Sequence, residues 1–363
     1  MPFQIIRNDI TKVTADAIVN TANPRPVIGA GTDSAIYQAA GADLLLAERQ
    51  KIGDITPGEA AVTPAFGLNA KYIIHTVGPA WIDGDHGERE TLHSCYEKSL
   101  ALAAELSCQS IAFPLIATGV YGFPKDEALD IALGEIGKFL LTHEMEVTLV
   151  VFDKKAFELS EKLVGGIEAY IDEHAAGFLR AREYGIGYND PRRRRLDDEL
   201  MMHSESIRPP EDAFEDFCSS EAFAAAPKSA PSRPNPVSAA KKTLDELLKR
   251  KEDTFQQRLF KLIDKRGLDD VTVYKRANID RKVFSKIRCN VDYKPKKKTA
   301  VAFAIALELD MPEMEDLLSR AEYAMSPHSE FDLIISYFVN NHNYDIYEIN
   351  SALFKYGQPL LGY

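Results

Sequence analysis

Two asparagines, two glycines and an aspartate lie close together in the stretch "NTANPRPVIGAGTDSAI", residues 20–36. A carboxylate such as that of Asp33 can orient or deprotonate a water molecule, and an amide such as that of Asn23 can fix a ligand hydroxyl group. Gly29 and Gly31 let the backbone approach a ligand where a Cβ atom would collide. These residue types are those of a loop that could hold a phosphorylated ligand and position a water molecule beside it. A turn motif and a helix N-cap are the structural alternatives.

A second glycine-containing stretch, "PLIATGVYGFP", covers residues 114–124. Both stretches follow an apolar run and lead into a helical pattern, so each offers backbone N–H groups and a helix N-terminus to a ligand. Two such electropositive loops suit a diphosphate. Turns between strands and helices often need glycine in any case, so neither loop alone is diagnostic.

The elements that would position these loops form an alternating pattern. Apolar, β-branched runs at "FQIIR", "AIVNTA", "YIIHTV", "SIAFPLIA" and "VTLVVF" alternate with expected helices from Ser34, at 91–106, at 126–142 and near 155–172. Such alternation predicts an α/β fold, with a mixed, mostly parallel sheet flanked by helices. Ligands bind such sheets beyond the carboxyl ends of the strands.

The rest of the chain differs in character. Residues 176–242 are rich in Pro, Ser, Ala and mixed charge, which predicts a largely irregular linker. From residue 243 to 363 helical periodicity returns with short connections, which predicts a compact all-α domain. The expected organisation is therefore an α/β domain over 1–175, a linker over 176–242 and an all-α domain over 243–363.

Composition limits the classes of function. The formal net charge is -12, yet residues 249–298 contain 17 lysine and arginine residues against 7 aspartate and glutamate residues. This asymmetry indicates nucleic acid or an acidic partner for one part of the chain. The four cysteines form no CxxC pair and no zinc spacing, so we expect no metal site and no disulfide framework. With no signal-peptide or membrane-spanning pattern, we expect a cytoplasmic protein.

Residues 4–163 resemble a macrodomain, the ADP-ribose-binding module. The resemblance is carried by "RNDITKVTADAIVNTAN", "GDITPGEAAVTPAFGLNAKYIIHTVGPAW", "IAFPLIATGVYGFP" and "VVFD". Within the superfamily the stretch is similar to the MacroD-type branch, whose members remove ADP-ribose from modified acidic side chains and deacetylate O-acetyl-ADP-ribose. The resemblance implies ADP-ribose or an ADP-ribosylated protein as the ligand and requires no cofactor.

The resemblance assigns roles to individual residues. Asp9 is expected to accept from the adenine amino group beside Ile10, and Phe152 to stack on adenine; a turn or N-cap and ordinary core packing are the alternatives. Asn23 and Asp33 are expected beside the distal ribose as the catalytic residues of a hydrolysis that requires no metal ion. Asn20 is expected to brace the loop through a backbone hydrogen bond. The remaining expected ADP-ribose contacts are Gly29, Ala30, Gly31, Thr32, Ala117, Thr118, Gly119, Val120, Tyr121, Gly122 and Phe123, with Tyr121 and Phe123 closing over the ribose.

Several residues depart from the family pattern. The family loop usually reads Gly-Gly-Gly-Val-Asp-Gly, whereas this chain has Ala30, Thr32 and Ser34, and Ala117 stands where serine is frequent. We expect binding to survive these changes, while rate or substrate choice differs. The sequence therefore leaves two functions open, a hydrolase and a reader that binds ADP-ribose without turnover. His75 lies among apolar residues, which favours a buried, hydrogen-bonded histidine over a catalytic base.

The helical patterns at 271–288, "VTVYKRANIDRKVFSKIR", resemble the helix-turn-helix of lambda-repressor-like domains. The turn is expected at Asn278, with a second helix starting near Asp280. That helix would direct five residues to nucleic acid, namely Arg281, Lys282, Ser285, Lys286 and Arg288. Protein interaction and a purely structural role remain alternatives for the same helices.

Overall fold

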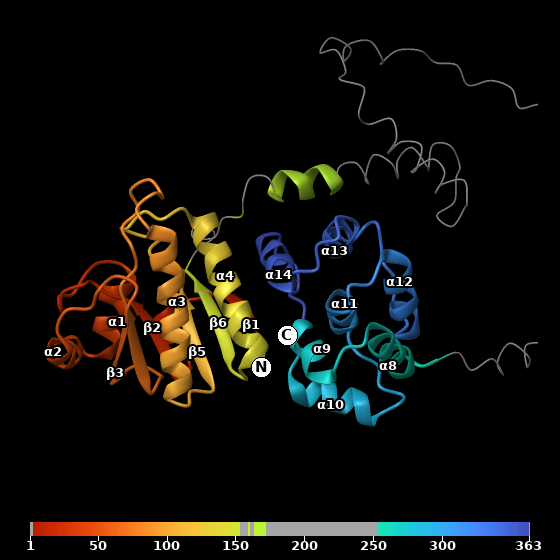
Figure 1. The fold of residues 1–363 in the computed structure, drawn as a ribbon, viewed down its shortest axis with the longest axis horizontal. Coiled ribbons are helices and arrows are strands. Elements are labelled where there is room, and N and C mark those ends of the chain that lie inside the picture. Colours follow the sequence, from red (N-terminus) through yellow and green to blue (C-terminus); the bar gives the residue numbers. More distant parts are fainter. Residues whose placement is uncertain (1–2, 153–158, 160–162, 172–252, 363) are drawn as a thin grey trace, which may run out of the picture. The chain divides into compact units, whose positions relative to one another are not determined.

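The computed structural model describes residues 3–152, 159, 163–171 and 253–362. Its N-terminal part is built on a six-stranded sheet in the order β1-β6-β5-β2-β4-β3 (Figure 1). The strands are β1 (Phe3–Arg7), β2 (Ala17–Thr21), β3 (Ala60–Pro64), β4 (Tyr72–Thr76), β5 (Ser110–Pro114) and β6 (Glu146–Val151). Neighbouring strands are parallel except β3, which runs antiparallel to β4. The predicted mixed, mostly parallel sheet is confirmed, and β3 is an additional strand.

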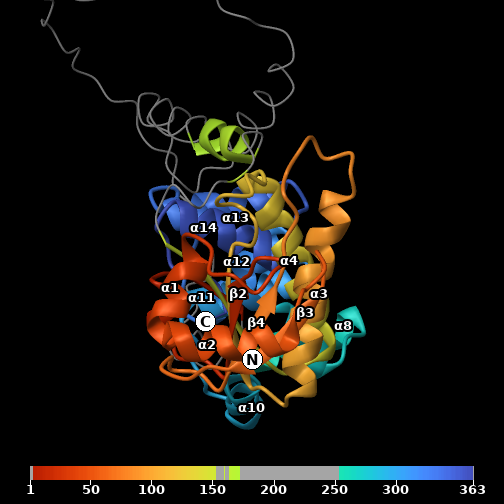
Figure 2. The same ribbon diagram turned by 90° about the vertical axis from the view of Figure 1, so that its left-hand side faces the viewer.

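Helices cover both faces of this sheet. They are η1 (Ile10–Lys12), α1 (Thr32–Ala40), α2 (Ala42–Ile52), α3 (Glu88–Glu105) and α4 (Lys125–Thr142). Along β2, Ala17 and Val19 join the core under α3 and α4, whereas Ile18 joins the core under α1 and α2. This period of two is the reason why apolar residues occupy every position of a strand that is covered on both faces. The two helical layers are seen on opposite sides of the sheet in Figure 2.

The C-terminal part is helical, as predicted. Its helices are α8 (Phe255–Arg266), α9 (Asp270–Arg276), α10 (Arg281–Cys289), α11 (Lys297–Ala306), α12 (Met311–Arg320), α13 (Glu330–Asn340) and α14 (Ile346–Lys355). Side chains of N-cap residues fix several starts, and Thr254 forms a capping box with Gln257. Asn278 adopts a left-handed φ of 52° between α9 and α10, and Asp280 caps α10, so the expected turn is present.

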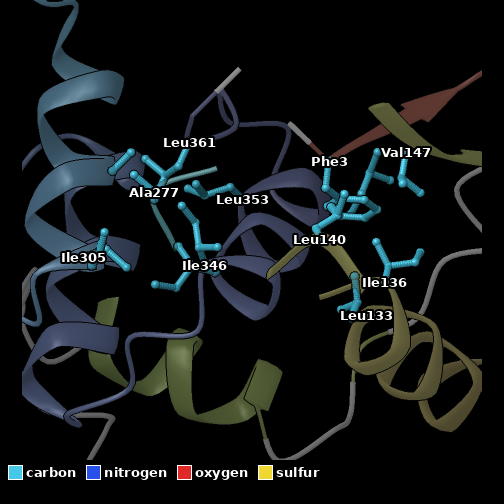
Figure 3. Packing of buried hydrophobic residues seen from close by; sticks show 14 of the residues in the cluster. Phe3, Leu133, Ile136, Leu140, Val147, Ala277, Ile305, Ile346, Leu353 and Leu361 are labelled. Carbon is cyan, nitrogen blue, oxygen red and sulfur yellow. The ribbon is translucent and has the colours of Figure 1, made fainter. Parts of the chain in front are cut away.

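The C-terminal helices pack against α4 and the edge strand β1, and the described residues form one compact unit. Asn278 binds both backbone groups of Phe3: its Oδ1 accepts from the Phe3 N–H at 2.6 Å, and its Nδ2 donates to the Phe3 carbonyl at 2.8 Å. The Tyr347 ring lies 5.5 Å from the Phe3 ring, centroid to centroid. Buried apolar residues of both parts belong to one hydrophobic cluster. Figure 3 shows Phe3 and Leu140 on one side of the contact and Ile346 and Leu353 of α14 on the other.

Parts of the expected organisation lie outside the described residues. These are the linker at 176–242, residues 243–252 of the expected all-α domain and most of the N-terminal portion of the helix near 155–172. The portion of that helix at 163–171 is described, and the Tyr170 hydroxyl oxygen accepts a hydrogen bond from Asn340 Nδ2 of α13 at 2.8 Å. None of the helices in the described ranges combines the length and apolar composition that crossing a membrane requires.

Candidate functional site

A cleft of about 330 Å³ opens at the carboxyl ends of β2, β5 and β6, which are neighbours in the sheet. The loop after β2 and the loop after β5 form its walls, so both glycine-containing stretches meet at one place, as the sequence predicts. The lining residues are Thr21, Asn23, Gly29, Ala30, Gly31, Thr32, Asp33, Pro114, Leu115, Ala117, Thr118, Gly119, Val120, Tyr121, Lys125, Val150, Val151 and Phe152.

The first wall is the loop after β2, which is held together by a hydrogen bond to the carboxylate of Asp33. Asp33 lies in the first turn of α1, and its Oδ2 accepts from the Gly29 N–H at 2.6 Å. Gly31 is the N-cap of α1 at φ 63° and ψ -127°, a conformation that strongly favours glycine. Among the described residues, no group accepts from the N–H groups of Ala30, Gly31 and Thr32. These donors are therefore available to an anion in the cleft.

Asp33 is the first member of a buried network of hydrogen-bonded polar side chains. Its Oδ1 accepts from Asn20 Nδ2 at 2.7 Å, and the same nitrogen lies 3.1 Å from His75 Nδ1. Thr63 Oγ1 lies 2.9 Å from His75 Nε2. Because Asn20 Nδ2 is only a donor, His75 Nδ1 is an acceptor and the ring proton resides on Nε2. Asn20 thus braces the loop through the Asp33 side chain, and not through the backbone as expected from the sequence.

Burial shifts the pKa values of Asp33 and His75 in opposite directions. Burial raises the pKa of Asp33 above its ordinary value, although hydrogen bonds from Gly29 and Asn20 and the charge of Arg49 oppose this effect. Burial, with a further contribution from Arg49, lowers the pKa of His75 to about 3. His75 is therefore a neutral, fully buried histidine, which confirms the structural alternative that the sequence favoured over a catalytic base.

Asn23 lies directly across the loop from Asp33. Its Nδ2 donates to the Val27 carbonyl at 3.2 Å. A Cβ atom on Gly29 would lie 2.5 Å from Asn23 Nδ2 and 3.1 Å from Asp33 Oδ2. Glycine at position 29 is therefore required for the amide and the carboxylate to approach each other. The arrangement joins the two candidate catalytic residues in one cleft wall.

The second wall is the loop after β5. Ala117 adopts a left-handed φ of 64°, a conformation that costs a residue with a Cβ atom about 1 kcal/mol. Its carbonyl accepts from the Phe123 N–H, and the Gly119 carbonyl accepts from the Gly122 N–H, both at 3.1 Å. Within the described part of the chain, the N–H groups of residues 118–121 have no acceptor. They form a second row of donors opposite the first.

One end of the cleft is apolar. Phe152 follows β6 with 74% of its surface exposed, and Val120 is 84% exposed. Asp9 lies just beyond β1, next to this end, because the Asn8 N–H donates to the Val151 carbonyl at 3.1 Å. Asp9 caps η1, and its Oδ1 accepts from the Thr11 N–H and hydroxyl groups. The exposed Phe152 ring is not core packing, whereas Asp9 does serve as an N-cap.

Most of the expected site residues line the cleft, but five do not. Asn20 and Ile10 are buried, Asp9 stands beside the lining, and Gly122 shapes the second loop at φ 67°. Phe123 is buried against the Trp81 ring at 4.7 Å, so only Tyr121 of the expected aromatic pair borders the cleft. No motif in the sequence marks the buried Arg49 or six further lining residues, namely Thr21, Pro114, Leu115, Lys125, Val150 and Val151.

One cluster has the side-chain types of a metal site, Asp83 with His86 and Glu88. The Glu88 carboxylate already accepts from backbone N–H groups of its own loop, including that of His86 at 2.7 Å. Asp83 is bonded to the His86 ring at 2.9 Å. These hydrogen bonds show that the three side chains hold the loop at the start of α3 in place, so we do not assign them to a cation.

The basic residues expected to contact nucleic acid are exposed on α10. Arg281, Lys282, Ser285, Lys286 and Arg288 follow the spacing i, i+1, i+4, i+5 and i+7, which places them on one side of the helix. Arg288 pairs with Asp270 and lies 5.3 Å from the centroid of the Phe260 ring. Arg281, Lys282 and Lys286 form no ion pair with any described residue. Most cations of the neighbouring helices are paired.

A mostly parallel sheet with a cleft between two rows of backbone N–H donors defines an α/β domain, and such donors suit a phosphorylated ligand. The macro domain family model matches residues 19–132. A macro domain-containing protein of Listeria monocytogenes serotype 4b (strain F2365) is 46% identical over 171 residues, which cover 45% of this chain and 97% of that protein. The O-acetyl-ADP-ribose deacetylase of Citrobacter rodentium (strain ICC168) is 44% identical over 167 residues, covering 45% of this chain and 94% of that protein. This chain belongs to the macro domain family.

A solved structure of the Oceanobacillus iheyensis macrodomain with ADP is also similar to this chain. It is 38% identical in sequence, with a TM-score of 0.40, and the match covers 42% of this chain and 84% of that one.

Proposed function

We propose that the cleft binds ADP-ribose and hydrolyses an ester bond to it, either the bond to an acidic side chain of a modified protein or the acetyl ester of O-acetyl-ADP-ribose. The observation that carries this proposal is the meeting of two rows of backbone N–H donors with Asn23 and Asp33 in one cleft. The name of the Citrobacter relative supports the choice of ester.

The shape of the cleft supports one orientation of the ligand. The two rows of N–H donors suit the diphosphate, which carries its negative charge between two sugars. The exposed Phe152 ring suits the adenine base, and Asp9 beside it suits the adenine amino group. The distal ribose then reaches Asn23 and Asp33, where the ester bond is to be cleaved.

The chemistry follows from the contacts of Asp33. A carboxylate has about four acceptor positions, and Gly29 and Asn20 occupy two of those on Asp33. A remaining position orients a water molecule, and the ligand phosphate can share in accepting its proton. The water adds across the ester bond to give ADP-ribose and a free carboxylic acid, so neither a metal ion nor a redox cofactor is needed.

Turnover should depend on the ionisation of Asp33. Because burial raises its pKa above the ordinary value of 3.8, we expect the single-turnover rate to be constant near neutral pH and to fall as the pH decreases through this raised pKa. His75, with a pKa of about 3, does not titrate in that range. The measurement is release of ADP-ribose from an ester-modified protein between about pH 4 and 8. A rate that instead follows a titration near the ordinary histidine value of about 6.5 would contradict the assignment.

Phe152 should contribute to affinity and not to folding. Because the ring is exposed, Phe152→Ala should leave thermal stability nearly unchanged, while loss of stacking on adenine should weaken ADP-ribose binding by about 5- to 150-fold. Phe152→Tyr keeps the ring and is the matched control. Calorimetry measures the affinity for ADP-ribose and for ribose 5-phosphate, which lacks the adenine base. Equal weakening for both ligands would exclude the stacking role.

A reader that binds without turnover is the second candidate function of the cleft. It is favoured by Ala30, Thr32 and Ala117, which depart from the family pattern, and all three line the cleft. The single-turnover measurement decides between the two. Binding of ADP-ribose with no release from the ester-modified protein would establish the reader.

For the C-terminal helices, we infer that α10 binds the phosphate backbone of duplex DNA. The supporting observation is the concentration of unpaired, exposed cations on one side of this helix, in a chain whose formal net charge is -12. Helix-turn-helix proteins present such a face to the major groove. The role would be to hold the cleft near nucleic acid. A protein partner is the competing outcome.

Three substitutions test the DNA proposal. Arg281→Ala, Lys282→Ala and Lys286→Ala together should weaken binding and lower the slope of log affinity against log salt by about one for each lost phosphate contact. The control combines Lys261→Ala, Lys265→Ala and Lys294→Ala, which remove the same charge from ion-paired positions. Fluorescence anisotropy at several salt concentrations measures both. Equal effects of the two triple variants, or no salt dependence, would point to a protein partner.

A further inference from the structure

Arg49 is a buried cation beside the cleft that neither the sequence motifs nor the proposed chemistry uses. It belongs to the last turn of α2, and only 1% of its surface is exposed. None of the ion pairs among the described residues involves it. A guanidinium group that is buried without a direct ion pair is costly, because the more distant charges of Asp33 and Asp54 offset its lost hydration only in part. The presence of a buried arginine at position 49 is therefore not explained by a gain in stability.

The guanidinium group instead donates to backbone carbonyls of the first cleft wall. Its Nη2 lies 3.3 Å from the Asn23 carbonyl oxygen and 3.2 Å from that of Pro24, and its Nη1 donates to the Gly53 carbonyl. Asn23 and Pro24 start the loop that ends at Asp33. The planar, forked guanidinium can hold several acceptors in fixed directions, which a lysine ammonium cannot reproduce.

We propose that Arg49 is a positioning residue, which fixes the Asn23–Pro24 backbone against α2 and thereby sets the Asn23 amide opposite the Asp33 carboxylate in the cleft. The effect of Arg49 on catalysis rests on the proposed function. The positioning of the Asn23 amide does not depend on that function. A second consequence is electrostatic. The positive charge of Arg49 lowers the pKa of Asp33 against the effect of burial, and it lowers the pKa of His75. Arg49 thus favours a charged carboxylate and a neutral imidazole in adjacent positions.

Two variants separate geometry from charge. Arg49→Met replaces the side chain by an apolar one of similar length, removing both the hydrogen bonds and the charge. Arg49→Lys keeps the charge and loses the forked geometry. Leu45→Val is the matched control, since Leu45 is a fully buried residue of the same helix whose apolar side chain belongs to the hydrophobic core and carries neither charge nor hydrogen-bond donor.

The first measurement is nuclear magnetic resonance of the full-length, ligand-free protein, which does not depend on turnover. In Arg49→Met we expect the Asn23 side-chain amide resonances to shift and broaden, and the Asp33 carboxyl group to titrate at higher pH. In Arg49→Lys the amide resonances should change while the Asp33 titration stays near that of the wild type. Leu45→Val should change neither. Wild-type behaviour of both signals in Arg49→Met would overturn the inference, whether or not the protein is an enzyme.

The second measurement is the single-turnover rate against pH. We expect Arg49→Met to lower kcat/KM by about 10- to 100-fold and to move the acid limb to higher pH, because both the geometry and the charge are lost. Arg49→Lys should lower the rate and keep the acid limb in place. A fall in melting temperature with an unchanged rate and acid limb would show that Arg49 only supports the fold. An inert wild type with the expected resonance changes would refute the proposed function and leave the positioning intact.

Discussion

Gly29→Ala should lower kcat/KM for ester hydrolysis by about 100-fold and leave the folded protein stable. The added Cβ atom would lie 2.5 Å from Asn23 Nδ2, which is the mobile end of a side chain. The Asn23 side chain can move away at little cost to folding, because among the described residues its amide group bonds only to the Val27 carbonyl, at 3.2 Å. The movement takes the Asn23 amide away from its position opposite Asp33, so we expect kcat/KM to fall while the free energy of unfolding stays nearly unchanged.

The measurements are single-turnover kinetics, ADP-ribose calorimetry and thermal unfolding of the full-length variant. Gly134→Ala is the control, because a Cβ atom at Gly134 of α4 meets no atom within 4 Å. That substitution should stabilise the helix by about 1 kcal/mol and leave the kinetics unchanged. If Gly29→Ala retains wild-type kcat/KM, the approach of Asn23 to Asp33 has no role in the reaction.

Asn278→Ala should lower the free energy of unfolding by about 3–5 kcal/mol. Asn278 is buried, and its side chain is the partner of both the N–H and the carbonyl group of Phe3 on the edge strand β1. Each backbone group left buried without a partner costs about 1–3 kcal/mol, and alanine at a φ of 52° adds about 1 kcal/mol of strain. The substitution thus weakens the contact between the sheet and the C-terminal helices.

Urea denaturation of the full chain, followed by circular dichroism, measures this effect. Asn278→Gly removes the hydrogen bonds without the backbone strain and should show most of the loss. His342→Ala is the control for strain alone, because His342 is exposed at a φ of 53°. A loss below about 1 kcal/mol for Asn278→Ala would mean that the Phe3 backbone finds other partners.

Local patterns in the sequence predict the elements of this fold well where the periodicity is strong. The five expected strands, the helices at 88–105 and 125–142 and the helical character of the C-terminal part are present. β3 is missed because "AAVTP" contains two alanines and a proline and has little β propensity of its own. It pairs with β4, so its formation depends on a neighbour that follows it in the chain.

The site is predictable in outline for a similar reason. Carboxyl ends of parallel strands meet at one edge, so glycine-containing loops after β2 and β5 were expected to face each other. The partners of individual side chains were not predictable. Arg49 reaches carbonyls 25 and 26 residues before it, and Asn278 binds a backbone 275 residues away. Neither contact leaves a local pattern, since each depends on how complete elements pack.

The most direct test is a calorimetric titration of ADP-ribose into the full-length protein near neutral pH. We expect one binding site per chain with a dissociation constant in the micromolar range, and a marked loss of affinity in Phe152→Ala. Absence of any heat of binding, confirmed by an unchanged melting temperature at saturating ADP-ribose, would contradict a diphosphate site between the two loops.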